Sequence, residues 1–203
     1  HDELGNESNM RMWGIKATEL HSHIALIRSL HKLKLREVLS NCHSHYSFHY
    51  GILSAEELLK IAVRAGAKHV ALTDVNSTAS CLDFLRRARE FNLHPVVGID
   101  FKEAAQTKYV ALAKDNKGFE EINRHLSQQL MYKSPIPDRA PAFSNAYVIY
   151  PFTGVPTKRL RENEFVGIRP SELMRLQFSS WIDVPEKLVL LQPMTFRNKS
   201  DFN

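Results

Sequence analysis

Short apolar runs that resemble strands alternate with amphipathic segments that resemble helices from about residue 37 to residue 152. The runs 69-HVALTD-74 and 94-HPVVGID-100 are both compact and apolar, and both end in polar residues. This form is typical of buried parallel strands with a loop at the carboxyl end. The alternation therefore predicts an α/β fold built on a parallel sheet. In such folds, ligands collect at the carboxyl ends of the strands.

The predicted helices have recognisable ends and faces. Ser54 begins the first as a capping box with Glu57, and Gly66 ends it. Two further helices are predicted over about residues 77–91 and 118–131. The inward faces predicted for the three helices are Leu58, Ile61, Ala62 and Ala65; Leu82, Leu85 and Ala88; and Phe119, Ile122 and Leu126.

The rest of the chain is less regular. Further strands are predicted at 37–42, 107–114, 145–152 and 187–192, with a proline-rich loop at 134–141 and a short helix near Pro170. Near the start, apolar residues at a helical spacing predict an amphipathic helix over residues 18–35. That helix would either pack on the body of the protein or bind a partner.

Composition excludes few functions. The longest apolar runs are far too short to cross a membrane. Cys42 and Cys81 are too few for a disulfide framework or a four-thiolate zinc site, which favours a reducing cytoplasm. The net charge of +5 is compatible with nucleic-acid contact, but the densest basic stretch, 158–161, adjoins Glu162 and Glu164. Such a mixed-charge stretch is typical of a solvated surface.

Polar residues at the strand ends suggest a site. Asn41, His43, Asp74 and Asp100 follow or end three successive predicted strands and could converge on one point. The string 43-HSHYSFH-49 adds more histidines, and imidazole and carboxylate groups are common ligands of divalent metals.

These residues carry a family resemblance. The string 43-HSHYS-47, followed by Gly51, Ser54 and 56-EEL-58, resembles the opening of the polymerase-and-histidinol-phosphatase (PHP) domain, in the version found at the N-terminus of the bacterial DNA polymerase III alpha subunit. The likeness continues through 72-LTDVN-76, 94-HPVVGIDF-101, 110-VALAKDNKGFEEIN-123 and 136-IPDRAP-141.

The resemblance implies a particular architecture. The expected fold is α/β: a partial, irregular (β/α)7-like barrel of PHP type, with an N-terminal helical extension. Residues 1–38 form the extension, and residues 39–203 form the PHP-like domain. We expect this domain to stop before the family's last metal motif, an Asp-x-His.

The resemblance also implies a metal site that this chain has largely lost. Active PHP domains are phosphoesterases that hold metal ions with histidines and acids. Their first His-x-His motif corresponds here to 41-NCH-43. Positions that hold an acid, a histidine and a second histidine in the family are Tyr50, Val75 and Lys108. We expect a vestigial site at Asn41, His43, Tyr50, Val75, Asp100 and Lys108, in which only His43 and Asp100 keep their roles as donors, and we expect no metal.

Several alternatives stay open at this stage. A manganese or zinc site rebuilt from His43, His45, His49, Asp74 and Asp100 would make the chain a metal-dependent phosphoesterase or 3′–5′ exonuclease. Otherwise His45 and His49 are surface histidines, and Asp74 bonds the backbone amides of the loop that follows it.

Four further side chains have expected roles. Lys108 would either pair with Asp100 in place of a metal or be solvated. Cys42 should face the core without acting as a nucleophile. Tyr46 and Phe48 are expected to be packing residues.

The leading functional hypothesis is a non-catalytic scaffold within a replicative polymerase. The resemblance implies a parent that is a DNA-directed DNA polymerase, a nucleotidyltransferase that acts in the cytoplasm with Mg and contacts DNA. The expected partners are the remainder of the alpha subunit and the proofreading exonuclease subunit. A free-standing binding module unrelated to replication is a further hypothesis.

Overall fold

The computed structural model describes residues 38–157, 159–191 and 193–194, which belong to one compact unit. The N-terminal extension was predicted over residues 1–38, and only Val38 of it is described. The predicted helix over residues 18–35 lies outside the described residues.

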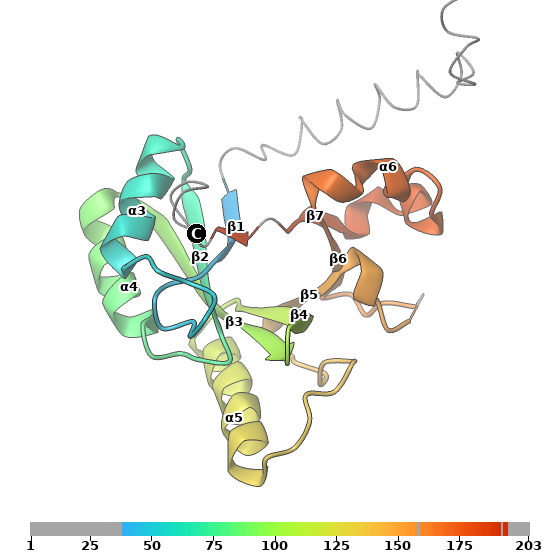
Figure 1. Ribbon diagram of the computed structural model, residues 1–203, viewed down its shortest axis with the longest axis horizontal. Coiled ribbons are helices and arrows are strands. Elements are labelled where there is room, and N and C mark those ends of the chain that lie inside the picture. The colour runs from blue at the N-terminus through green and yellow to red at the C-terminus, as the bar shows by residue number, and fades with distance from the viewer. Residues whose placement is uncertain (1–37, 158, 192, 195–203) are drawn as a thin grey trace, which may run out of the picture. The chain divides into compact units, whose positions relative to one another are not determined.

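The described residues form one curled, mixed sheet (Figure 1). Its eight strands are β1 (Val38–Cys42), β2 (His69–Val75), β3 (His94–Glu103), β4 (Gln106–Ala113), β5 (Ala146–Pro151), β6 (Glu164–Ile168), β7 (Leu188–Leu190) and β8 (Pro193–Met194). The order across the sheet is β7-β6-β5-β4-β3-β2-β1-β8. This partial barrel confirms the predicted fold class.

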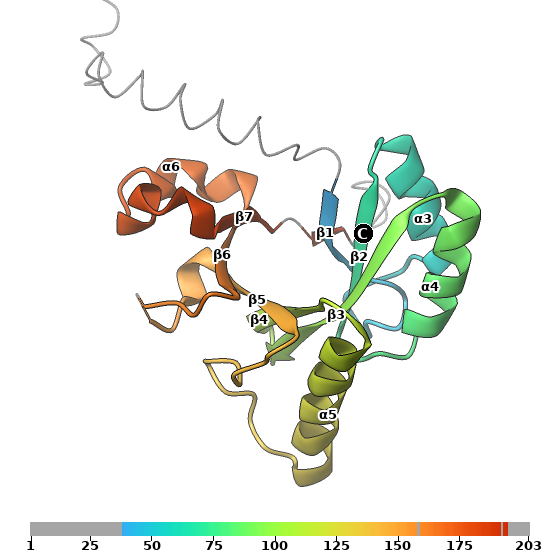
Figure 2. The same ribbon diagram turned by 180° about the vertical axis from the view of Figure 1, so that it is seen from behind.

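Helices cover the outer side of the curled sheet. They are α3 (Ala55–Arg64), α4 (Cys81–Ala88) and α5 (Asn116–Tyr132), while the short α6 (Leu173–Leu176) lies beyond β6 and β7 (Figures 1 and 2). Single 3-10 turns occur at Arg89–Phe91, Phe152–Gly154, Pro170–Glu172, Ser180–Asp183 and Pro185–Lys187. Both views place α3 beside α4, and α5 alone against β3, β4 and β5.

The sheet is only partly parallel, which corrects the sequence prediction. Strands β1, β2 and β3 run parallel, and so do β5, β6 and β7. Between these sets, β3 pairs antiparallel with β4, and β4 with β5. The chain turns from β3 into β4 at Ala104, whose φ is +51°. A connection this tight cannot contain the crossover that parallel neighbours need. Strands β6 and β8 were not predicted.

The helix ends agree with prediction better than the helix faces do. Ser54 and Glu57 form the predicted capping box, and Gly66 has a φ of +72° just beyond α3. In α4, however, Leu82 is 75% exposed, which contradicts its predicted inward position. The helix begins only at Cys81, and its buried residues are Cys81, Phe84 and Ala88.

Two apolar clusters fill the space between sheet and helices. The first joins β1, β2 and the start of β3 to α3 and α4, with Leu58, Leu72 and Phe84 fully buried. The second joins β3, β4 and β5 to α5, and it includes Ile99 and Ile122. Because side chains alternate along a strand, the residues between these core positions face the inner side of the curled sheet. The candidate site lies there.

Candidate functional site

At the end of β1, successive side chains point alternately to the apolar core and to the inner face of the sheet. Cys42 lies in the first apolar cluster, and burial together with the charge of Asp74 raises the pKa of its thiol to about 12. The thiol therefore stays protonated and is no nucleophile, as expected. Its neighbours Asn41 and His43 take the opposite side and are buried. The amide oxygen of Asn41 accepts a hydrogen bond of 2.6 Å from the Thr73 hydroxyl on β2.

Asp100 and His43 meet at the centre of this inner face. Asp100 lies on β3, where it is the register partner of Val75 on β2. Its Oδ2 lies 3.1 Å from Nε2 of His43, and the two side chains are 1% and 2% exposed. The contact lacks the alignment of a hydrogen bond, so both ring nitrogens of His43 and Oδ1 of Asp100 have no hydrogen-bond partner. Buried polar atoms without partners are costly and are rare in folded proteins.

Lys102 places its ammonium against the same carboxylate. It is two residues beyond Asp100 on β3 and therefore shares its face. Its Nζ lies 3.6 Å from Oδ2 of Asp100, and its side chain is 12% exposed. The hydroxyl of Thr107 on β4 donates a longer hydrogen bond of 3.4 Å to the same oxygen.

Tyr50 covers Lys102 from the loop that follows β1. The Lys102 ammonium lies 3.9 Å from the centroid of the Tyr50 ring, a distance typical of a cation–π contact. The phenol hydroxyl of Tyr50 donates to the carbonyl of Ala104, at 3.1 Å. The ring is thereby tied to the far end of β3.

Asp74 faces away from this cluster and organises the loop instead. Its carboxylate accepts hydrogen bonds from the Ser44 amide at 2.6 Å, from the Ser44 and Ser47 hydroxyls at 2.7 Å each, and from the Ser80 hydroxyl. All four groups are buried. Asp74 therefore has a hydrogen-bonding role, as expected. However, most of its partners belong to the loop after β1, whereas the prediction placed them in the loop that follows Asp74.

Comparisons with known proteins identify the fold family. The PHP domain family profile matches residues 40–151, which is more than half of the chain. The chain belongs to the PHP domain family.

Individual relatives of this PHP chain are bacterial polymerases. The DNA polymerase III subunit alpha of Ureaplasma parvum is 38% identical over 79 residues, which cover 39% of this chain and 8% of that protein. The error-prone DNA polymerase of Pseudomonas paraeruginosa is 33% identical over 88 residues, which cover 43% and 9%. The predicted similarity to the polymerase III alpha subunit is confirmed. The chain spans about a tenth or less of the length of these relatives.

A solved structure is more distantly similar. A candidate metal-dependent phosphoesterase from Bifidobacterium adolescentis overlays with a TM-score of 0.47 at 13% identity, covering 80% of this chain and 88% of that one. A likeness this remote says nothing about chemistry.

Within the described residues of this PHP chain, no helix is long and apolar enough to cross a membrane.

The donor set of this PHP domain does not fit a metal centre. Asn41 uses its amide oxygen for Thr73, while Tyr50 and Val75, at positions where the family resemblance implies ligands, have an aromatic ring and an aliphatic side chain. His43 and Asp100 remain as donors, and an ammonium lies beside them. In the described part of the chain, no group of three His, Cys, Asp or Glu residues could hold a metal ion.

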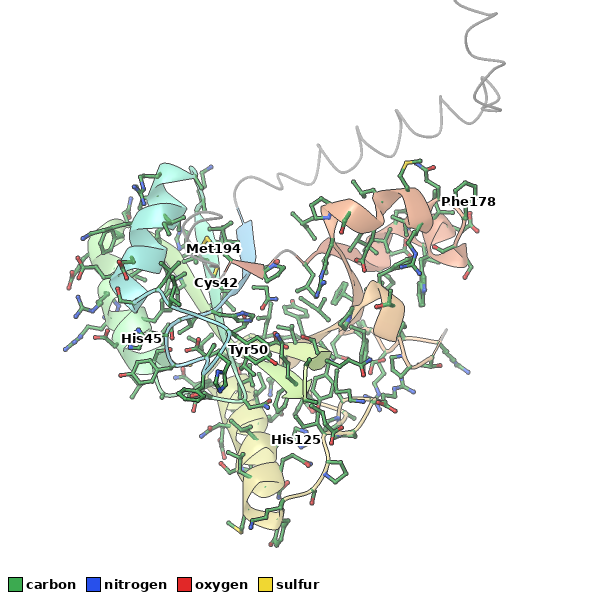
Figure 3. All side chains as sticks on the ribbon, viewed as in Figure 1. Cys42, His45, Tyr50, His125, Phe178 and Met194 are labelled. Atoms are coloured by element: carbon green, nitrogen blue, oxygen red, sulfur yellow. The ribbon has the colours of Figure 1, made fainter. Side chains whose placement is uncertain are left out.

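The histidines of the alternative site do not join His43 and Asp100. His45 and His49 are exposed, and His49 has a φ of +67°. Figure 3 shows His45 on the helix side of the loop, apart from Tyr50. Tyr46 and Phe48 in the same loop are 50% and 79% exposed, so their prediction as packing residues is wrong. The buried serines fix the loop and leave these rings outside.

Lys108 does not have the predicted partner. Its ammonium lies 2.6 Å from Oδ1 of Asp138 and 3.9 Å from Oε2 of Glu103, so the suggested pairing with Asp100 is wrong. The antiparallel course of β4 and the irregular register before Tyr109 direct Lys108 toward the loop at Asp138. Lys102, which the sequence reasoning missed, pairs with Asp100. The strand was predicted to end at Asp100, whereas β3 continues to Glu103, and that continued alternation places Lys102 on the same face as Asp100.

Proposed function

We propose that this chain is the N-terminal PHP-like domain of a replicative DNA polymerase III alpha subunit and that it acts there as a non-catalytic scaffold with a vestigial phosphoesterase site. The proposal rests mainly on the composition of the inner face. His43 and Asp100 keep metal-donor atoms, while Tyr50, Val75 and Lys102 supply none.

The scaffold role follows from what the fold retains. Two apolar clusters and a continuous ladder from β7 to β8 give the domain a stable body that needs no metal for its packing. In the proposed parent, nucleotidyl transfer with Mg belongs to other domains. Residues 39–203 would brace the remainder of the alpha subunit and offer a surface to the proofreading exonuclease subunit. DNA would be contacted through the parent chain, in the cytoplasm.

A metal titration tests the vestigial site. The full chain, purified without chelator, is melted in rising concentrations of Mn²⁺ or Zn²⁺. A ligand stabilises a protein in proportion to its binding to the folded state, so we expect no rise in Tm. We also expect no metal-dependent hydrolysis of a phosphomonoester or of single-stranded DNA. Tight binding of two metal equivalents, lost in His45→Ala or His49→Ala, would contradict the proposal.

The scaffold role needs a test in the parent chain. The reading frame beyond Asn203 should encode a polymerase palm domain. Deleting residues 39–203 from that parent should abolish or strongly reduce primer extension, whereas His43→Gln should leave it unchanged. Loss of primer extension in the His43→Gln parent would indicate that the inner-face site is active.

A further inference from the structure

The buried Asp100 carboxylate needs a positive charge nearby, and a lysine of this chain supplies it. The Asp100 side chain is 1% exposed, and an ionised carboxylate removed from water requires a compensating positive charge. In PHP domains that hold metals, the ions would supply that charge. Here the ammonium of Lys102 lies 3.6 Å from Oδ2.

Lys102 is fixed at this place from two directions. The Asn76 side chain clasps its backbone: Nδ2 donates to the Lys102 carbonyl at 2.7 Å, and Oδ1 accepts from the Lys102 amide at 3.0 Å. Its ammonium lies over the Tyr50 ring, which is held by the carbonyl of Ala104. The arrangement is therefore built into β3 and the loop and is not a chance contact of a solvated lysine.

We propose that Lys102 is a built-in cation that replaces metal as the counter-charge of Asp100 and keeps the inner face of the domain closed to divalent ions. The inference rests on the proposed vestigial site and adds the residue that maintains it.

Charge balance and the neighbouring aromatic ring both support this assignment. Asp100 is the single acid of the cluster formed by Asn41, His43, Tyr50, Asp100 and Lys102, so one ammonium neutralises it. Even one divalent ion would leave excess positive charge beside an ammonium, in surroundings that screen charges poorly. The Tyr50 ring, at the position where the family resemblance implies an acid, supplies a π-face to the cation. The Tyr50 and Lys102 side chains therefore complement each other.

The test substitutes Lys102 in the full chain. Lys102→Met keeps most of the length of the side chain and removes its charge, Lys102→Arg keeps the charge, and Lys60→Met is the control. Lys60 is an exposed lysine that pairs with Glu56 on α3. In metal-free buffer, we expect Lys102→Met to lower Tm by about 5 °C or more, because it leaves a buried charge unpaired. Lys102→Arg and Lys60→Met should stay within about 2 °C of the parent, as substitutions that leave no buried charge unpaired do.

Metal should then rescue the neutral variant alone. Because His43 and Asp100 offer only two donors, the effect should be small: millimolar Mn²⁺ or Zn²⁺ should raise the Tm of Lys102→Met slightly and leave the parent, whose ammonium repels the ion, unchanged. Adding Asp100→Asn to Lys102→Met should abolish this rescue and also restore part of the metal-free stability, because neither buried charge then remains. The double variant keeps the test valid if Lys102→Met alone fails to fold: a double variant no more stable than Lys102→Met overturns the proposal.

Two other outcomes separate this proposal from the one on which it rests. If the parent itself binds metal tightly, the vestigial site is refuted and the built-in cation with it. If the parent binds no metal, but Lys102→Met is as stable as the parent and gains nothing from metal, only the built-in cation is refuted.

Discussion

At the scale of single residues, Asp74 is the side chain on which the loop after β1 depends. It accepts hydrogen bonds from Ser44, Ser47 and Ser80, all buried. Asp74→Ala would leave those donors unsatisfied, and we expect it to lower the free energy of unfolding by about 3–5 kcal/mol in a urea titration.

Asp83 provides the matched control for this prediction. It is a partly exposed acid on α4 whose carboxylate pairs with Arg86 and Arg87. Asp83→Ala should cost no more than about 1 kcal/mol, because exposed ion pairs contribute little. Equal losses in the two variants would show that Asp74 is not a special anchor of the loop.

We expect His125 to make the stability of the domain depend on pH. Its Nε2 lies 2.8 Å from the Tyr109 hydroxyl in the second apolar cluster, and burial lowers the pKa of the imidazole. Above the ordinary pKa of histidine, about 6.5, a buried imidazole whose pKa is lowered on folding contributes its full stabilisation. That stabilisation is lost as the pH falls toward the lowered pKa.

The measurement compares urea midpoints at pH 7.5 and pH 5.5. The His125→Gln variant keeps a polar partner for Tyr109, but its side chain does not titrate. From pH 7.5 to pH 5.5, the stability of this variant should therefore fall less than that of the parent. The exposed histidines contribute equally to both proteins and cancel in the difference. An identical fall in both proteins would remove His125 as its source.

At the scale of elements, the approach of the loop to the end of β1 depends on Gly51. A Cβ at this position would lie 2.1 Å from the carbonyl oxygen of Ser44. We expect Gly51→Ala to cost about 1–3 kcal/mol or more, because the backbone must move to relieve the contact. Gly154→Ala is the control, since a Cβ there meets nothing closer than 3.9 Å. Its urea midpoint should stay near that of the parent.

Local signals made some elements predictable and left others hidden. The Ser54 capping box and the apolar runs of β2 and β3 act within a few residues, so their sequence was sufficient. The short β8 depends on pairing with the distant β1, which the sequence pattern did not reveal. The antiparallel hairpin at Ala104 is local, but its turn, Ala104 and Ala105, has no glycine or asparagine to indicate it. Lys102 was missed for a different reason: the family resemblance directed attention to Lys108, whereas the alternation of β3 brings Lys102 to Asp100.

At the scale of the described domain, β3 belongs to both apolar clusters and should make them unfold together. Val97 contributes to the first cluster and Ile99 to the second. We expect Leu72→Ala and Ile122→Ala to lower the free energy of one shared transition by about 2–5 kcal/mol each. His49→Ala, at an exposed position, should change it by less than about 0.5 kcal/mol. Two separate steps in far-UV circular dichroism would mean that the clusters are independent.

The two outermost strands of the sheet are very short. β7 has three residues and β8 has two, and the sequence of β8 begins with Pro193. A sheet edge invites aggregation when it offers a long row of unpaired amides and carbonyls to another chain. Among the described residues, these edges offer only a brief row. The sheet, although it does not close on itself, should therefore be a poor template for strand-by-strand growth into fibrils. Any self-association of the domain should come instead from exposed side chains such as Phe178, which projects from the segment after α6 (Figure 3).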